Sequence, residues 1–204
     1  MTADALPVPN QPPLRDAELA EHLAILIAGS PTVMRVLTTV RELGLPDWRL
    51  FSGAIYQTVW NALTDRDADH GIKDYDIGYF DPDTGWDAED RVIKRAAAAF
   101  DAPLSGKVEV RNQARVHLWF EEKFGEPYPP VACTDDALTR FVCPAFAVGV
   151  RLEDDDVLTV SAPFGLGDLF TMRLRRNPTR IISDAAFGRV TGSAKARWPE
   201  LEIV

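Results

Sequence analysis

Hydrophobic side chains recur every three or four residues near the start of the chain. Leucines and isoleucines between residues 19 and 27 predict a helix that ends at Gly29. A second apolar stripe, from 33 to 40, predicts another helix that has a serine cap and a proline in its first turn. Residues 1–14 carry four prolines and are expected to form a tail without packed structure.

The middle of the chain alternates between short apolar or aromatic runs and longer segments of helical spacing. The runs predict strands, because they lie between turn-forming residues, and the longer segments predict helices. Strands are expected at 48–51, 75–80 and 108–110, a hairpin at 145–152 and 157–162, and helices at 55–63, 88–100, 112–120, 166–171 and 185–198. This order predicts one α+β domain over residues 15–204, in which a mixed β-sheet is flanked by helices, with helices before it and a helical C-terminal extension.

Composition and charge narrow the possible partners. The chain has 204 residues, of which 46% are hydrophobic, and its net charge is −9. A negative field repels polyanions, so we do not expect nucleic acid as a partner. No apolar stretch approaches the roughly 20 residues of a membrane span, and the first residues do not resemble a signal peptide. We therefore expect no membrane partner and a cytoplasmic location, with Cys133 and Cys143 as free thiols.

Two aspartates at the start of the second predicted strand are the first candidates for chemistry. Side chains at i and i+2 of a strand share a face, so Asp74 and Asp76 present two carboxylates side by side. Such a pair repels itself unless a cation neutralises it, and oxygen ligands suit Mg²⁺. The alternative is a solvated strand end, which is common in an acidic chain.

A glycine turn lies upstream of this pair. Gly53 and Ala54 follow a predicted strand and open a predicted helix, where backbone N–H groups can approach a phosphate. Strand, glycine turn, helix, and a strand carrying Asp-x-Asp resemble the nucleotidyltransferase superfamily that includes DNA polymerase beta. That resemblance implies divalent metal, Mg²⁺ or Mn²⁺, held by the carboxylates and bridging nucleotide phosphates. Ala54 offers no hydroxyl to a phosphate, so backbone N–H groups would have to bind it.

A second block makes the resemblance closer. The segment 107–117, with its Asn-Gln-Ala-Arg-x-His run, resembles a bacterial family of nucleotidyltransferase proteins that was formerly a domain of unknown function. The likeness extends over residues 15–201. The remaining blocks that carry it are 53–60, 74–81, 127–128, 162–166, 168–170 and 195–199.

The resemblance implies roles for several polar residues. In the resembling family a third carboxylate is expected on a neighbouring strand, and Glu109 is the candidate for it. The alternative is that Glu109 is simply an exposed residue of its strand. Arg115 is expected to clamp a triphosphate, and Gln113 and His117 to contact substrate. His117 would act as a general base or donate a hydrogen bond. Asn112 is expected at the substrate or as a helix cap.

Four arginines gather near the C-terminal end of an otherwise acidic chain. Arg173, Arg175, Arg176 and Arg180 could receive a phosphate or an anionic acceptor. The alternative is a solvated surface on which each arginine pairs with an acidic neighbour.

These observations predict a metal-dependent enzyme that transfers a nucleoside monophosphate from an NTP to a hydroxyl group of a small-molecule or protein acceptor. The main alternative is a catalytically degenerate nucleotide- or ligand-binding protein on the same fold. Two weaker hypotheses are a calcium loop at 65–76, whose glycine comes one position late, and a hydrolase that pairs a cysteine with His117.

Overall fold

A five-stranded mixed sheet lies at the centre of the protein. The computed structural model describes residues 16–204, so the predicted tail at 1–14 lies outside the described residues. The strands follow the order β3-β2-β1-β4-β5, and only the β2–β3 pairing in this sheet is parallel. Their bounds are β1 Arg49–Phe51, β2 Tyr75–Tyr79, β3 Val108–Asn112, β4 Gly149–Leu152 and β5 Leu158–Ser161.

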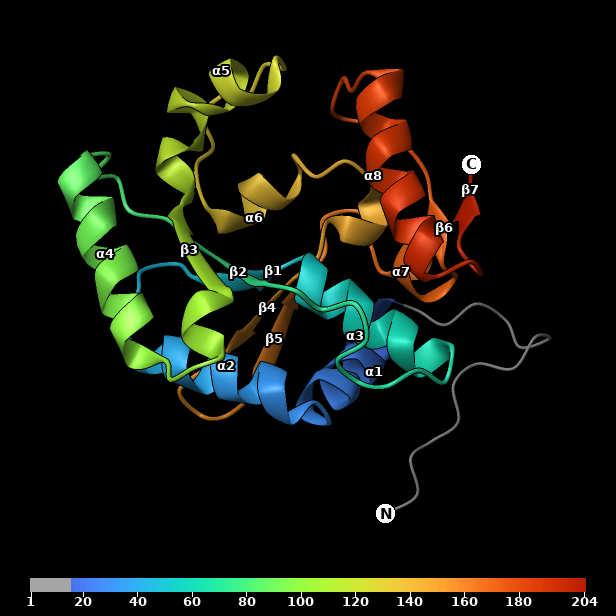
Figure 1. The fold of residues 1–204 in the computed structure, drawn as a ribbon, viewed down its shortest axis with the longest axis horizontal. Coiled ribbons are helices and arrows are strands. Elements are labelled where there is room, and N and C mark those ends of the chain that lie inside the picture. Colours follow the sequence, from blue (N-terminus) through green and yellow to red (C-terminus); the bar gives the residue numbers. More distant parts are fainter. Residues whose placement is uncertain (1–15) are drawn as a thin grey trace.

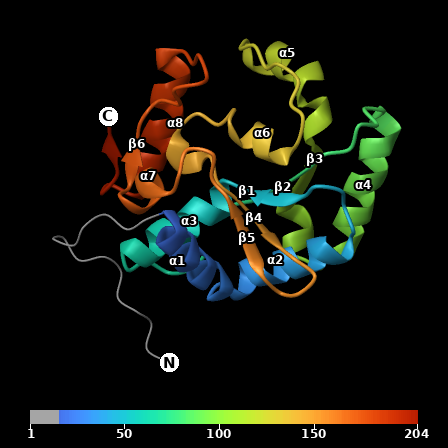
Figure 2. The ribbon, with the colours of Figure 1, turned by 180° about the vertical axis from the view of Figure 1, so that it is seen from behind.

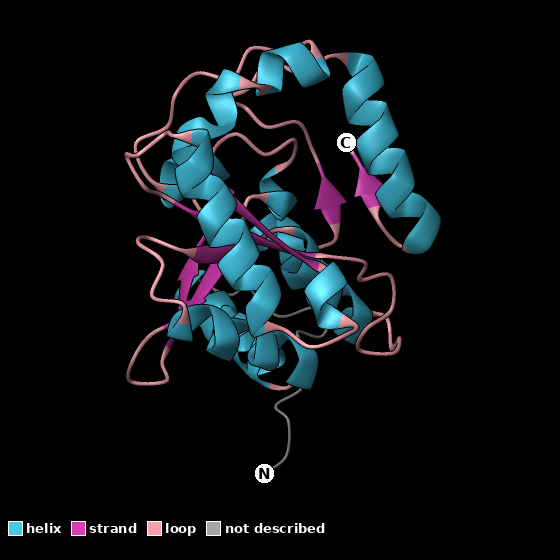
Figure 3. Cartoon of the chain, turned by 60° about the vertical axis from the view of Figure 1, so that its left-hand side comes forward, coloured by secondary structure: helices cyan, strands magenta, loops and turns pink. Residues whose placement is uncertain are grey.

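Helices cover both faces of this sheet, as Figures 1 and 3 show. α1 and α2 lie below it in Figure 1, and the β4–β5 hairpin lies beside them in Figure 2. α4 packs along β3, and α5, α6 and α8 stand above the sheet. The helices are α1 Asp16–Ala28, α2 Pro31–Glu42, α3 Gly53–Leu63, α4 Trp86–Ala99, α5 Phe120–Phe124, α6 Thr134–Leu138, α7 Gly167–Phe170 and α8 Asp184–Arg197. The predicted mixed sheet flanked by helices is therefore confirmed.

Strand register separates an apolar face of the sheet from a polar one. Leu50 pairs with Ile77 and Val150, and Ile77 pairs with Val110, so these side chains share a face and enter the main core. Phe51 pairs with Asp76, which pairs with Glu109, so the opposite face carries two of the predicted carboxylates. A one-residue slip would bury these charges, and the apolar face therefore fixes the register.

The two N-terminal helices follow the sequence pattern closely. The Ser30 hydroxyl accepts a hydrogen bond from Val33 N at 3.4 Å, and Pro31 is the first residue of α2. Within residues 16–204, no single helix has the length and apolar composition to cross a membrane. α1 and α2 reach that length only when taken together, and they meet at a bend of 95°.

The loop between α3 and β2 is tied to the last helix. The Asn61 side chain donates to Ala68 O and His70 O, and its Oδ1 accepts from Trp198 Nε1 at 3.0 Å. Trp198 is fully buried, and its ring packs edge-on against His70 at 5.7 Å. A two-stranded parallel sheet, β6 Arg173–Leu174 with β7 Glu202–Ile203, holds the segment after α8. The end of α8 is therefore fixed beside the start of β2.

The predicted helix at 112–120 takes a different form. Residues 113–118 form a 3₁₀ helix, and the short α5 follows it. The Asn112 side chain accepts from Ala114 N, two residues on, which favours the tighter turn. This correction changes which side chains share a face of the segment, because residues i and i+3 align in a 3₁₀ helix.

Candidate active site

Three carboxylates lie near one another on the polar face of the sheet. Asp74 directly precedes β2, Asp76 is within it, and Glu109 is the β3 partner of Asp76. Asp76 is the one exposed residue of β2, because its carboxylate opens into a cavity above the sheet. Glu109 is also exposed and lies 3.7 Å from the Arg111 guanidinium.

The electrostatics of Asp76 distinguish it from an ordinary surface aspartate. Desolvation of the carboxyl group by the surrounding protein, together with the charges of Asp74 and Glu109, raises the pKa of Asp76 to about 6, and the charge of Arg111 offsets only part of this rise. A carboxylate held beside two others is strained by repulsion, so the site favours a cation.

The start of α3 leaves backbone N–H groups without a helical partner beside the aspartates. Ser52 has a φ of +50°, a conformation that side-chain-bearing residues rarely adopt, and its backbone N–H donates to Val148 O at 2.8 Å. The first N–H groups of α3 have no partner within the helix, and the Ser52 hydroxyl makes no capping bond. A methyl group added to Gly53 would lie 3.9 Å from Asp74 Oδ1, so this helix end and the carboxylates are neighbours. Ala54 is fully buried, and its side chain packs in the core.

A polar cavity of about 250 Å³, here called the α3 cavity, lies between the start of α3, the aspartates and α8. Its cationic walls are Lys73, from the loop before β2, and Arg197, from the last residue of α8. Arg197 donates to Gln57 Oε1 and Gly71 O, each at 3.2 Å. Burial raises the pKa of Tyr56, a further wall residue that interacts electrostatically with Arg197 and Asp74.

Ser52, Lys73 and Arg197 are among the residues of this cavity that sequence reasoning missed. Ser52 had a signal, since it directly precedes the glycine of the predicted turn. Arg197 lies inside the block 195–199, but its distance from the aspartates in sequence hid the contact. Lys73 carried no sequence signal beyond its position next to Asp74.

A second cavity of about 250 Å³, here called the aromatic cavity, opens on the other side of Asp76. Gly78 and Phe51 both line it. The Phe51 ring packs so closely on Gly78 that a methyl group added to this glycine would overlap the ring. The remaining walls come from β3, α5, α6 and the loops beside them. They include Glu109, Arg111, Gln113, Trp119, Phe120, Tyr128, Arg140, Phe141 and Arg180.

Two of the expected substrate contacts lie away from both cavities. Arg115 is buried, and its Nε lies 2.9 Å from Glu89 Oε2 while Nη1 donates to Thr84 O. Asn112 is buried as well, and it braces the turn after β2 through Asp81 and caps the 3₁₀ helix. Neither belongs to the described residues that line the two cavities, and their contacts are those of structural groups.

Gln113 and His117 differ in their placement. Gln113 lines the aromatic cavity and donates to Arg111 O at 3.3 Å. His117 is half-buried, lines neither cavity, and has a buried Nδ1 without a hydrogen-bond partner among the described residues. Its expected role as a base or donor to the substrate stays a prediction.

The arginine cluster is largely neutralised by ion pairs. Each of its four members lies within 3.2 Å of a carboxylate, and one of the four, Arg180, reaches the aromatic cavity. The pairs are Arg173–Glu202, Arg175–Asp168, Arg176–Asp184 and Arg180–Glu126. This arrangement matches the alternative of a surface on which each arginine pairs with an acidic neighbour, rather than a phosphate site.

The cysteine hydrolase and the calcium loop find no supporting geometry. Both cysteines are free, as expected, and burial raises the pKa of the Cys143 thiol to about 12. The Cys133 sulfur accepts from Asp136 N at the start of α6. Across residues 16–204, no three His, Cys, Asp or Glu side chains gather closely enough to hold a metal ion as they stand, and this includes the aspartates at 65–69.

The donor chemistry at the carboxylates still suits a divalent cation. Asp74 and Asp76 supply oxygen ligands from one face, and their mutual repulsion leaves charge to be neutralised. Glu109 would complete the set only if its side chain turned from Arg111 toward Asp76. The aspartate pair therefore fits the ion that the resemblance implies, with Glu109 within reach.

Comparison with known proteins agrees with this geometry. The family described as Nucleotidyltransferase matches residues 38–203, a range that includes Ser52, both aspartates, Glu109 and Arg197. This chain is a member of the nucleotidyltransferase family. The family and its fold support NTP as the substrate class and transfer of a nucleotidyl group as the chemistry. No curated protein matches this chain at a significant level.

A solved structure resembles this chain in fold. Its title reads "The NMR structure of the protein reveals a CCA-adding enzyme head domain". The two chains are 24% identical, the match covers 90% of this chain and 95% of the other, and the TM-score is 0.71. At this identity the likeness establishes the arrangement of sheet and helices.

Proposed function

We propose that this protein transfers a nucleoside monophosphate from an NTP to a hydroxyl group of a small-molecule or protein acceptor, with Asp74, Asp76 and Glu109 as catalytic residues and ligands of Mg²⁺ or Mn²⁺. The observation that carries the proposal is the position of Asp76, flanked by two other carboxylates and shared by both cavities. The predicted cytoplasmic location and the choice of acceptor remain part of this proposal.

The α3 cavity supplies what a triphosphate needs. The free N–H groups and positive end of α3 meet an anion at Gly53, and Lys73 and Arg197 add two cations. The Ser52 hydroxyl lies at the same place and supplies the donor that Ala54 lacks. These groups hold the β- and γ-phosphates and stabilise pyrophosphate as it leaves.

The carboxylates lie where the α-phosphate would be attacked. A bound divalent cation supplies neutralisation of the charge that builds up on the phosphate oxygens. Glu109 accepts the proton of the acceptor hydroxyl as the new oxygen–phosphorus bond forms and the bond to pyrophosphate breaks. Asp74 and Asp76 would hold the divalent cation that draws the α-phosphate toward the start of α3, and Arg115 keeps the turn after β2 in place through Glu89.

One observation favours a degenerate binding protein instead. Glu109 lies beside Arg111, and the described residues contain no preformed three-ligand cluster. A protein of this kind would bind NTP in the α3 cavity without transferring it, so the metal dependence of NTP binding, and not binding itself, separates the two functions.

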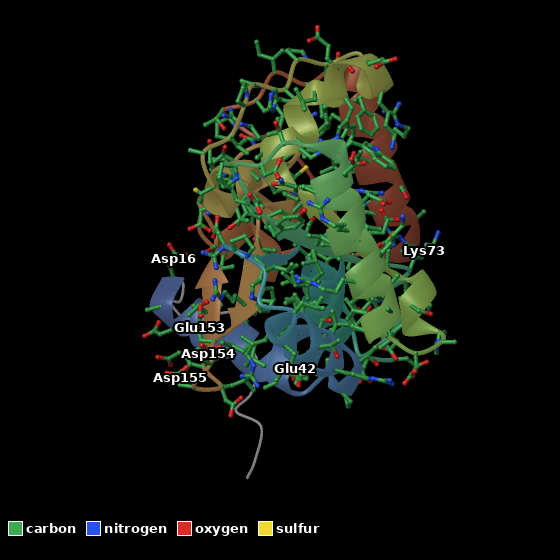
Figure 4. All side chains as sticks on the ribbon, turned by 90° about the vertical axis from the view of Figure 1, so that its left-hand side faces the viewer. Asp16, Glu42, Lys73, Glu153, Asp154 and Asp155 are labelled. Atoms are coloured by element: carbon green, nitrogen blue, oxygen red, sulfur yellow. The ribbon has the colours of Figure 1, made fainter. Side chains whose placement is uncertain are left out.

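Thermal melting tests the proposal. Each NTP is added with and without Mg²⁺ or Mn²⁺ to the wild type, to Asp74→Asn/Asp76→Asn, and to the control Asp154→Asn/Asp155→Asn. The control removes the same charge at the β4–β5 turn, on the opposite side of the molecule from Lys73 in Figure 4. A ligand at 100 times its Kd stabilises the native state by about 2.7 kcal/mol, which raises the Tm by about 5–10 °C at this size.

The expected result is a metal-dependent shift in the wild type and the control that is lost in the aspartate variant. A shift that is independent of metal and kept in the aspartate variant would favour the degenerate binding protein. No shift with any NTP, in a protein that melts cooperatively, would refute nucleotide binding at this site.

A further inference from the structure

The two cavities meet at Asp76 but differ in chemistry. The α3 cavity is polar, and its charged walls beside the aspartates are Lys73 and Arg197. The aromatic cavity is mostly apolar, and of the two it is the one that Glu109 also lines. Each cavity therefore offers a different class of ligand access to the same carboxylates.

The geometry of nucleotidyl transfer assigns these cavities to different substrates. The attacking and leaving oxygens lie roughly in line across the phosphorus atom. The sheet order β1-β2-β3 places the Gly53 turn, the aspartates and Glu109 in a row. If pyrophosphate leaves into the α3 cavity, the attacking hydroxyl must enter from the Glu109 side, which is the aromatic cavity.

The walls of the aromatic cavity favour a flat apolar body. Phe120 stacks obliquely on Tyr128 with ring centroids 4.7 Å apart, and Phe51 meets Phe141 edge-on at 5.9 Å. Together with Trp119 they present ring faces and edges to the space between them. A volume of about 250 Å³ is below the ~300–1,000 Å³ of sites for drug-sized ligands, so it suits one ring with small substituents rather than a polynucleotide.

Cationic groups mark the border of this cavity with a neighbouring surface hollow. Arg140, Arg180 and Tyr128 line both spaces. The Arg180 guanidinium is already paired, since it lies 2.5 Å from the Glu126 carboxylate and stacks over the Phe120 ring. Arg140 has only a 3.5 Å contact with Asp136, and its buried Nε has no partner among the described residues. Arg140 therefore has donors to offer to an anion.

We propose that the aromatic cavity is the acceptor site and that the acceptor is a small aromatic hydroxyl compound carrying an anionic group, a carboxylate or a phosphate. This inference rests on the proposed nucleotidyl transfer. The hydroxyl lies against Asp76 and Glu109, the ring lies among the aromatic side chains, and the anion meets Arg140. In the reaction the acceptor oxygen bonds to the α-phosphorus, pyrophosphate leaves with the electrons of the broken bond, and the hydroxyl proton passes to Glu109.

Three probes test the site on the full chain by ligand-observed NMR: 4-(hydroxymethyl)benzoate, 4-(hydroxymethyl)phenyl phosphate and benzyl alcohol. The two anionic probes should bind at least tenfold more tightly than benzyl alcohol, and their ratio distinguishes carboxylate from phosphate. Arg140→Gln should weaken the preferred anionic probe about tenfold and leave benzyl alcohol unchanged. Arg91→Gln removes the same charge from an exposed position on α4 and should change neither.

A cavity-filling variant separates acceptor from nucleotide. Val142, a half-buried wall residue, is changed to tryptophan, which should abolish probe binding and leave the NTP-induced Tm shift intact. Loss of that shift in folded Val142→Trp would place part of the nucleotide in the aromatic cavity and overturn the inference. Failure of both anionic probes, or binding that ignores Arg140→Gln, would also overturn it. Absence of any NTP shift in the wild type would instead refute the proposed function.

Discussion

Replacing Asp76 by asparagine should stabilise the fold while removing function. The pKa of Asp76 rises from 3.8 to about 6 in the folded protein, because burial and the charges of Asp74 and Glu109 disfavour its ionised form. Within the described residues, Asp76 makes no side-chain hydrogen bond that the amide would lose. A shift of this size corresponds at most to about 3 kcal/mol, and solvent in the cavity reduces it to about 1 kcal/mol. For a chain of this size, 1 kcal/mol raises the Tm by about 2–4 °C.

The pH dependence gives this prediction its sign. Between about pH 4 and pH 6 the folded state keeps a proton that the unfolded state has released, so the free energy of unfolding of the wild type falls as pH rises. Above pH 6 the penalty is constant. Melting curves of wild type and Asp76→Asn should therefore coincide below pH 4, separate between pH 4 and 6, and stay apart at pH 8.

Two controls make the test specific. Asp154→Asn, at the exposed β4–β5 turn, should leave the wild-type Tm unchanged within about 1 °C. Mg²⁺ should reduce the difference at pH 8, because a cation offsets the repulsion in the wild type alone. An unchanged or lower Tm for Asp76→Asn at pH 8, or a difference that does not vary with pH, would refute the electrostatic account.

Three further variants test other contacts. Gly78→Ala should cost about 1–3 kcal/mol in unfolding free energy, because its methyl group would overlap the Phe51 ring; an unchanged denaturation midpoint would contradict this packing. Arg197→Gln should weaken NTP binding about tenfold by calorimetry with little change in Tm, and equal affinity would remove Arg197 from the phosphate site. Arg115→Met should destabilise the protein by about 3–5 kcal/mol, because it leaves Glu89 buried without its partner. Adding Glu89→Gln to Arg115→Met should restore much of that stability in urea denaturation. If Arg115→Met alone were as stable as the wild type but had lost NTP binding, Arg115 would instead contact the triphosphate.

The fold was predictable where one local signal decided the conformation. The apolar stripes and the Ser30–Pro31 start gave both N-terminal helices, and the acidic turn between two apolar runs gave the β4–β5 hairpin. The prediction of a regular helix after β3 was wrong. The apolar periodicity of this segment did not reveal that the Asn112 side chain accepts a hydrogen bond from Ala114 N and tightens the turn. Short-range side-chain bonds of this kind compete with helical spacing and leave little trace in apolar patterning.

Most of the candidate site that could be predicted lies on the strands and at the Gly53 turn. Alternation placed Asp74 and Asp76 on one face, and the β2–β3 register brought Glu109 beside them. Arg115 was expected at the substrate because it belongs to the block that resembles the nucleotidyltransferase family, but it is paired instead with a buried glutamate 26 residues earlier in the chain. Arg197 could not be found, since only the docking of α8 on the loop before β2 brings it to the α3 cavity.

The distance in sequence between Ser52 and Arg197 has a consequence for folding. Arg197 contacts Gln57 across 140 residues of sequence and Gly71 across 126. The contacts that close the α3 cavity are therefore among those of largest sequence separation in the structure. Contacts of such separation are slow to form compared with the helices and hairpin that they join. In a refolding experiment, secondary structure should return first, and high-affinity nucleotide binding should return only with the docking of the last helix. A fluorescent nucleotide would then act as a clock for the final stage of folding rather than for its beginning.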